Sequence, residues 1–108
     1  MANLQKLSDD NFESTLSEAK VPVMIDFSAT WCQPCKALAP TMEAVAKEYS
    51  GRLDVYNIDV EESGTTAVQF GVTSVPTVIL FKDGREVDRF MGNQDLHSVK
   101  QRVEKTLV

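Results

Sequence analysis

Hydrophobic residues recur at intervals of three and four positions in three stretches of this chain, which is the spacing of one buried helix face. The stretches are residues 12–19, 38–49 and 96–107. Each predicts an amphipathic helix, and Gly51 after the second is a typical helix stop. A weaker pattern near residues 65–70 predicts a further short helix.

The first helix should begin just after the polar residues 8–10. Glu13 follows Asp10 at the spacing of a capping box, in which two side chains satisfy free backbone N–H groups at a helix start. We therefore expect Asp10 to cap this helix.

Runs of apolar residues between the helices predict strands. Residues 21–27 and 77–81 are almost entirely apolar, as expected of central strands that are covered on both faces. Residues 53–60 form a third run, and residues 4–7 could add a short edge strand.

A turn signal links the last two strands. Asp83-Gly84 stands between residues 77–81 and 86–91, and this dipeptide strongly favours a two-residue hairpin. The resulting order, β-α-β-α-β-α-β-β-α, predicts an α/β fold in which a mixed sheet carries helices on both faces.

Length, composition and charge narrow the classes of protein. The chain has 108 residues, and we expect residues 1–108 to form a single domain. It contains no apolar run of signal-peptide or membrane-helix length, so we expect a cytoplasmic protein with no membrane contact. The net charge is −5 and the basic residues are scattered singly, which argues against nucleic-acid binding.

Both cysteines of the chain lie in one short segment, TWCQPCK, at residues 30–36. A structural zinc site needs four ligands, and the sequence offers only Cys32, Cys35 and the distant His97, so we expect no metal. A purely structural disulfide would close a very small loop and gain little entropy. Cytoplasmic thiols are also kept reduced. A redox-active pair is the interpretation we prefer.

The position of the two cysteines in the predicted secondary structure supports redox chemistry. If the 38–49 helix extends back to Gln33 or Pro34, where a proline suits a first turn, Cys32 lies at its N-terminus and Cys35 one turn further. The positive end of the helix dipole then favours Cys32 as the thiolate. We expect Cys32 to be the exposed, attacking thiol and Cys35 to be the less exposed, resolving thiol. Gln33 and Pro34 should tune the redox couple.

The segments DFSATWCQPCK and SVPT and the Lys82-Asp83-Gly84 turn resemble those of the thioredoxin family, and the resemblance covers essentially the whole chain. It implies the thioredoxin fold, a central mixed five-stranded sheet flanked by four helices. It also implies a thiol-disulfide oxidoreductase that reduces protein disulfides through Cys32 and Cys35, without a cofactor of its own. The implied partners are disulfide-containing client proteins and a thioredoxin reductase that draws electrons from NADPH. We expect a monomer.

Asp26 interrupts the apolar 21–27 run and is a candidate catalytic residue. A strand aspartate often points to solvent, but cover on both faces would bury this one, and desolvation would raise its pKa. A buried carboxyl near the cysteines could act as base and acid for the resolving thiol. The resemblance assigns that role to Asp26, directly or through water.

Four further residues are candidates for substrate binding. Trp31 adjoins Cys32, and its large flat side chain suits contact with a client protein. The resemblance implies that the Val75–Pro76 bond is cis and lies beside the disulfide, with the Val75 backbone free to pair with an extended client segment. It also implies that Gly92 permits close approach at the binding groove.

Three positions differ from the usual family pattern: Gln33 replaces glycine, Ser28 replaces a common tryptophan, and Asn57 replaces a common lysine. Loss of that lysine should leave Asp26 more easily protonated. Two alternatives therefore stay open. One is a specialised reductant with a dedicated client or reductase, and the other is a thioredoxin-fold binding module whose cysteines are idle.

Overall fold

A five-stranded mixed sheet forms the centre of the computed structural model, which describes residues 4–108. The strands are β1 (Gln5–Leu7), β2 (Val23–Ser28), β3 (Asp54–Asp59), β4 (Thr77–Lys82) and β5 (Arg85–Met91), in the order β1-β3-β2-β4-β5. The pairs β1–β3 and β2–β3 are parallel, whereas β2–β4 and β4–β5 are antiparallel. The mixed sheet is therefore confirmed.

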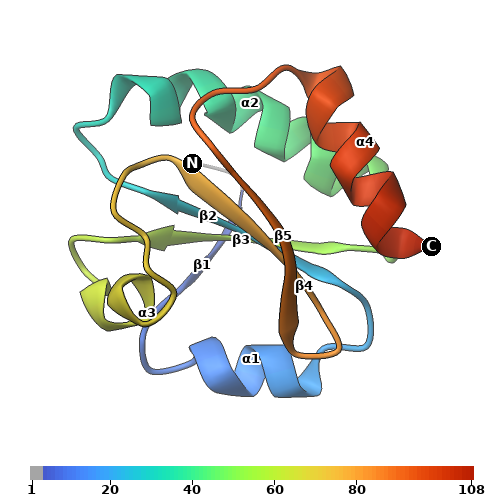
Figure 1. The fold of residues 1–108 in the computed structure, drawn as a ribbon, viewed down its shortest axis with the longest axis horizontal. Helices are drawn as coiled ribbons and strands as arrows, with labels where there is room; N and C mark the ends of the chain where they lie inside the picture. Colours follow the sequence, from blue (N-terminus) through green and yellow to red (C-terminus); the bar gives the residue numbers. More distant parts are fainter. Residues whose placement is uncertain (1–3) are drawn as a thin grey trace.

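Four helices cover the two faces of the sheet (Figure 1). They are α1 (Phe12–Glu18), α2 (Gln33–Glu48), α3 (Gly64–Gln69) and α4 (Leu96–Leu107). Helices α2 and α4 lie on one face and α1 and α3 on the other. Among the helices of residues 4–108, none has the length and apolar character needed to cross a membrane.

Strand β2 is central, and each of its six residues is buried. Met24 packs in the core under α2 and α4, whereas Ile25 and Phe27 pack in the core beside α1 and α3. The strand thus alternates between two hydrophobic cores, which explains why its sequence is nearly all apolar. Asp26 falls on the same face of the strand as Met24.

The predicted hairpin between β4 and β5 is present. Asp83 and Gly84 have φ angles of 55° and 79°. Positive φ at both central residues is the type I′ pattern, which the Asp-Gly pair adopts readily.

The predicted capping box at α1 is wrong. The N-cap is Asn11, with no side-chain cap, and the Asn11 side chain instead accepts a hydrogen bond from the Ser8 N–H at 2.8 Å. The turn that this hydrogen bond closes places the start of α1 after Asp10, so Asp10 is not the N-cap. Asp9 reaches another element: its Oδ1 accepts hydrogen bonds from the Thr66 N–H at 2.8 Å and the Thr66 hydroxyl at 2.7 Å.

We expect Asp9→Ala to lower the Tm by a few degrees, because it leaves the Thr66 N–H in α3 without its acceptor. Asp10→Ala is the matched control, since Asp10 is exposed and carries no cap. Thermal melts of both variants at neutral pH measure the difference. Equal melting temperatures would contradict a stabilising role for the Asp9–Thr66 contact.

Candidate active site

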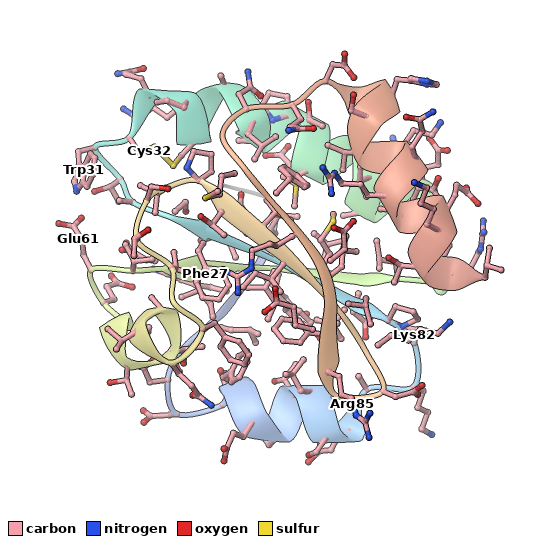
Figure 2. All side chains as sticks on the ribbon, viewed as in Figure 1. Phe27, Trp31, Cys32, Glu61, Lys82 and Arg85 are labelled. Carbon is pink, nitrogen blue, oxygen red and sulfur yellow. A yellow bond between two sulfur atoms is a disulfide. The ribbon has the colours of Figure 1, made fainter. Side chains whose placement is uncertain are left out.

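The two cysteines form a disulfide at the point where β2 passes into α2 (Figure 2). Their Cα atoms are 5.3 Å apart. Cys32 is the N-cap of the 16-residue helix α2, and its Sγ accepts a hydrogen bond from the Cys35 N–H at 3.2 Å. Pro34 lies in the first helical turn, where its missing N–H leaves no partner unsatisfied. The predicted placement of Cys32 at the helix N-terminus is confirmed.

The expected exposure of Cys32 is wrong for the oxidised protein. Cys32 is only 3% exposed and Cys35 only 1%, because Ala29 and Val75 pack around the disulfide. What distinguishes the two sulfurs is their position on the helix. Cys32 Sγ occupies the N-cap and lies 3.6 Å from the carbonyl oxygen of Val75. A Cys32 thiolate would therefore be stabilised by the helix terminus rather than by water.

Asp26 is fully buried, with no exposed surface. Within residues 4–108, neither of its carboxyl oxygens has a hydrogen-bond partner. This burial raises the pKa of Asp26 from its ordinary value of 3.8 to about 7. The expected burial and raised pKa are confirmed, so the group can hold or release a proton near neutral pH.

Asn57 and Ser28 form a neutral polar pair beside Asp26. Asn57 is the β3 partner of Asp26, and its Nδ2 donates to the Asp26 backbone carbonyl at 3.0 Å and to the Ser28 hydroxyl at 2.7 Å. The amide thus carries no positive charge to favour the ionised carboxylate. Desolvation therefore dominates the pKa of Asp26.

The segment that precedes β4 lies beside the disulfide, where Val75 packs against it. The Val75–Pro76 bond is cis, as the resemblance implies, and the Gly92 N–H donates to the Pro76 carbonyl at 2.9 Å. Gly92 has a φ of 80°, which a residue with a side chain rarely adopts. Within the described part of the chain, the Val75 N–H donates no hydrogen bond.

Two exposed hydrophobic side chains lie near this part of the molecule. Trp31 is 64% exposed, and Figure 2 shows it pointing outward beside Cys32. Met91, at the end of β5, is 60% exposed, and its sulfur accepts a hydrogen bond from the Ser74 hydroxyl. Sequence reasoning missed Met91, because only the β4–β5 pairing brings it opposite Thr77 and close to Pro76.

The Gln33 side chain is exposed and makes no hydrogen bond to Cys32 in the structure described. An influence of Gln33 on the redox potential would therefore have to act through its lack of charge or through contacts in the reduced protein. The site thus has one sulfur at a helix terminus, a second sulfur one turn inside, and a buried acid that titrates near neutral pH.

Comparisons with known proteins agree with this geometry. The family model described as thioredoxin matches residues 3–105. The chain is 40% identical to a thioredoxin of Staphylococcus haemolyticus over 102 residues, which is 94% of this chain and 96% of that protein. It is 41% identical to a thioredoxin of Staphylococcus epidermidis, with the same coverage. It is 38% identical to a chloroplastic M-type thioredoxin of Spinacia oleracea, over 96% of this chain and 58% of that protein.

Proposed function

Because this chain belongs to the thioredoxin family and is a thiol-disulfide oxidoreductase with a Cys-x-x-Cys active-site disulfide, we propose that it reduces protein disulfides in the cytoplasm. The observation that carries this proposal is the pairing of an N-cap sulfur, Cys32, with a second sulfur one helical turn away. In this scheme Cys32 is the attacking thiol, Cys35 the resolving thiol and Asp26 the proton carrier.

The first step is attack by Cys32. In the reduced protein its thiolate attacks one sulfur of a client disulfide, and the other client sulfur leaves as a thiolate. A mixed disulfide between Cys32 and the client results. The Cys35 N–H, 3.2 Å from Cys32 Sγ, and the N-terminus of α2 support this step because both stabilise the attacking thiolate.

The second step is resolution by Cys35. Its thiol passes a proton to the Asp26 carboxylate, directly or through water, and the new thiolate attacks Cys32 Sγ. The client then leaves as a dithiol, and the Cys32–Cys35 disulfide is restored. Asp26 suits this role because its pKa of about 7 lets it accept a proton near neutral pH.

Client binding would use the surface beside the disulfide. The free Val75 N–H can pair with the backbone of an extended client segment, in the manner of strand addition. Trp31 offers an exposed apolar surface beside Cys32, and Gly92 leaves open space where a side chain would otherwise project. These contacts would suit an extended client segment better than the surface of a folded client domain.

Membership of the family implies client proteins and a reductase in general terms. We further propose that a thioredoxin reductase fed by NADPH regenerates the dithiol and that the protein acts as a monomer. The neutral Ser28–Asn57 pair is the observation that favours the specialised alternative, a reductant with a dedicated client or reductase. An idle binding module is disfavoured, because the disulfide, the buried acid and the helix terminus are all in place.

Catalysed reduction of insulin by dithiothreitol tests the function. We expect the protein at micromolar concentration to accelerate precipitation of the reduced insulin chains well beyond the rate with dithiothreitol alone. Lys47→Glu, a charge reversal at the far end of α2, serves as the matched control because it is remote from both cysteines. An uncatalysed rate with the wild-type protein would contradict the proposed function.

A further inference from the structure

The sulfur-bearing side chains differ sharply in their exposure to solvent. Residues 4–108 contain five of them, and four are at most 3% exposed: Met24, Met42, Cys32 and Cys35. Met91 is 60% exposed. In the oxidised protein, where the disulfide occupies both cysteines, Met91 is thus the sulfur within the described residues that a dissolved oxidant reaches most easily.

Met91 lies beside the segment that we propose for client binding. It is the last residue of β5, and its neighbour Gly92 donates its N–H to the Pro76 carbonyl at 2.9 Å. The Ser74 hydroxyl donates to the Met91 sulfur at 3.8 Å. Because Ser74 directly precedes Val75, a group added to this sulfur would lie close to the backbone that pairs with the client in the proposed scheme.

The contact between Ser74 and Met91 is fixed by the sheet. The Thr77 hydroxyl donates to the Ser74 carbonyl at 2.7 Å, and Thr77 is itself the β4 partner of Met91. A thioether sulfur is a weak hydrogen-bond acceptor, whereas a sulfoxide oxygen is a polar group and a stronger acceptor. Oxidation of Met91 would therefore strengthen its contact with Ser74 and keep the added oxygen at this surface.

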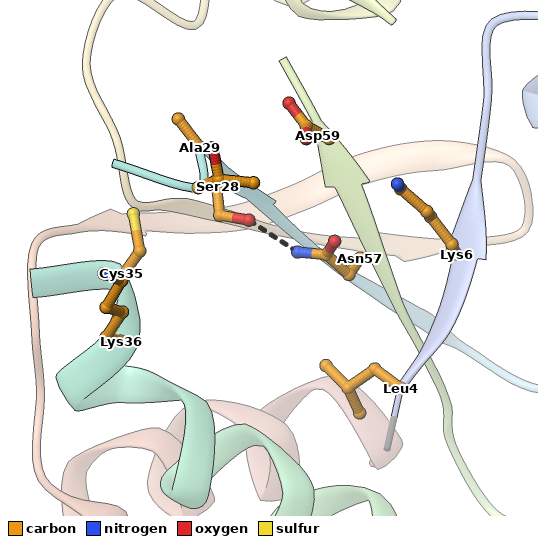
Figure 3. Close-up of a pocket in the computed structure, with 9 residues that line it drawn as sticks. Leu4, Lys6, Ser28, Ala29, Cys35, Lys36, Asn57 and Asp59 are labelled. Carbon is orange, nitrogen blue, oxygen red and sulfur yellow. Dashed lines mark hydrogen bonds between the residues drawn. The ribbon is translucent and has the colours of Figure 1, made fainter. Parts of the chain in front are cut away.

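The other open region beside the cysteines offers a poorer place for an apolar client side chain. A pocket of about 520 Å³ borders Cys35 (Figure 3). Its walls carry charged and polar side chains, which include Lys6, Lys36, Asp59, Ser28 and Asn57. An apolar group that entered this pocket would take water from those side chains at a cost. The exposed side chains of Trp31 and Met91 offer apolar contacts without that cost.

We propose that Met91 is a site of oxidation by hydrogen peroxide and that the resulting sulfoxide weakens the binding of protein clients. The proposal rests on the client surface of the proposed function. The Met91 sulfur forms a bond to one peroxide oxygen, and the O–O bond breaks. The second oxygen leaves as hydroxide, takes the proton of the transferred oxygen and becomes water. The sulfur thus loses two electrons and the peroxide gains them.

The sulfoxide changes the surface and leaves the redox couple intact. A client segment that packs on Met91 would have to remove water from a polar group in place of an apolar one. Cys32 and Cys35 keep their positions at the start of α2. Client binding should therefore weaken, while the chemistry of disulfide exchange should keep its rate.

Peroxide treatment of the oxidised protein, followed by tryptic digestion and mass measurement, tests the modification site. We expect the added oxygen in the peptide of residues 90–100, which contains Met91 and no other methionine. It should appear about tenfold faster than oxidation of Met24 or Met42, because both are fully buried. Equal rates at the three methionines, or no oxidation of Met91, would overturn the proposal.

The functional effect is measured on protein that has been oxidised at Met91, freed of peroxide and reduced with dithiothreitol, which is then removed. This protein is mixed with insulin, and acid quenching followed by alkylation counts its remaining thiols. We expect the second-order rate constant with insulin to fall about tenfold. With bis(2-hydroxyethyl) disulfide, which is too small to need an extended surface, the rate constant should stay within about twofold.

Three variants separate Met91 from general damage by peroxide. Met91→Leu cannot form a sulfoxide, so its rate with insulin should be the same before and after treatment. Met91→Gln, without peroxide, should react with insulin about tenfold more slowly than the wild type. Val87→Gln is the matched control at another exposed position of β5, near the hairpin, and should stay within about twofold of the wild type.

Three results would each overturn the proposal. They are an unchanged insulin rate in the oxidised wild type, a loss of rate in peroxide-treated Met91→Leu, and an effect of Met91→Gln no larger than that of Val87→Gln. If the untreated wild type still reduces insulin in any of these cases, the proposed function stands without the modification.

Discussion

Cys32→Ser should abolish the reduction of protein disulfides, with a loss of more than about 1,000-fold in rate, because it removes the nucleophile. Cys35→Ser should still attack a client but stall as a stable mixed disulfide on Cys32, because no second thiol can resolve it. Insulin reduction measures the first effect, and a mass shift equal to the bound client measures the second.

The assignment of the two roles depends on the helix terminus rather than on exposure, since both cysteines are buried in the oxidised protein. Alkylation of the reduced protein at neutral pH should therefore label Cys32 before Cys35, because only Cys32 lies at the N-cap of α2. Faster labelling of Cys35 would reverse the assignment. A client protein trapped on Cys35 in the Cys32→Ser variant would also reverse the assignment.

The sequence predicted the elements well because each carries a local signal. The period of the apolar residues located α2 and α4, the continuous apolar runs located β2 and β4, and Asp83-Gly84 located the hairpin. The position of Cys32 at the N-cap could also be predicted from a local signal, because Pro34 marks the first turn of α2. These features depend on a few neighbouring residues, so one sequence is enough to find them.

The errors and omissions concern contacts between distant segments. Asp10 was expected to cap α1 but does not, and its neighbour Asp9 instead binds Thr66, 57 positions away. Cys32 was expected to be exposed, but Val75, 43 positions away, packs against it. No local pattern encodes such pairs, since they depend on which strands lie side by side.

The pocket beside Cys35 illustrates the same limit. Ser28 and Asn57 were noted as departures from the family pattern, yet their hydrogen bond and the space they leave appear only in the folded sheet. Lys6 and Asp59, which complete the walls, carry no sequence signal of their own. By contrast, the burial of Asp26 could be predicted, because its flanking residues already required cover on both faces.

The catalytic role that we propose for Asp26 also has a kinetic consequence. Asp26→Asn keeps the shape of the side chain but cannot accept the Cys35 proton. We expect it to slow resolution of a mixed disulfide by about 100-fold or more at neutral pH, with a smaller effect on the initial attack by Cys32. Stopped-flow measurement of the two steps separates them, and equal slowing of both would contradict a role confined to Cys35.

The burial of Asp26 should make the stability of the oxidised protein depend on pH. The pKa of Asp26 is about 7 in the folded protein and near its ordinary 3.8 in the unfolded chain. Below pH 4 both states are protonated, and the carboxyl favours neither. Between pH 4 and 7 the unfolded chain releases the proton while the folded protein retains it, so the free energy of unfolding falls as pH rises. Above pH 7 both are ionised, and the loss is complete.

Asp26→Asn removes this dependence, and we therefore expect it to stabilise the oxidised protein at neutral and alkaline pH. The shift spans roughly three pKa units, and at about 1.4 kcal/mol per unit the gain reaches about 4 kcal/mol above pH 7. Near pH 4 the gain should shrink towards zero, because a protonated carboxyl and an amide are both neutral polar groups with similar burial costs. Urea unfolding of both proteins at pH 4, 6 and 8 measures the difference, with Asp10→Asn as a control for an exposed aspartate. A variant less stable than the wild type at pH 8, or a difference that does not change between pH 4 and 8, would show that the folded protein does not hold Asp26 as a desolvated acid.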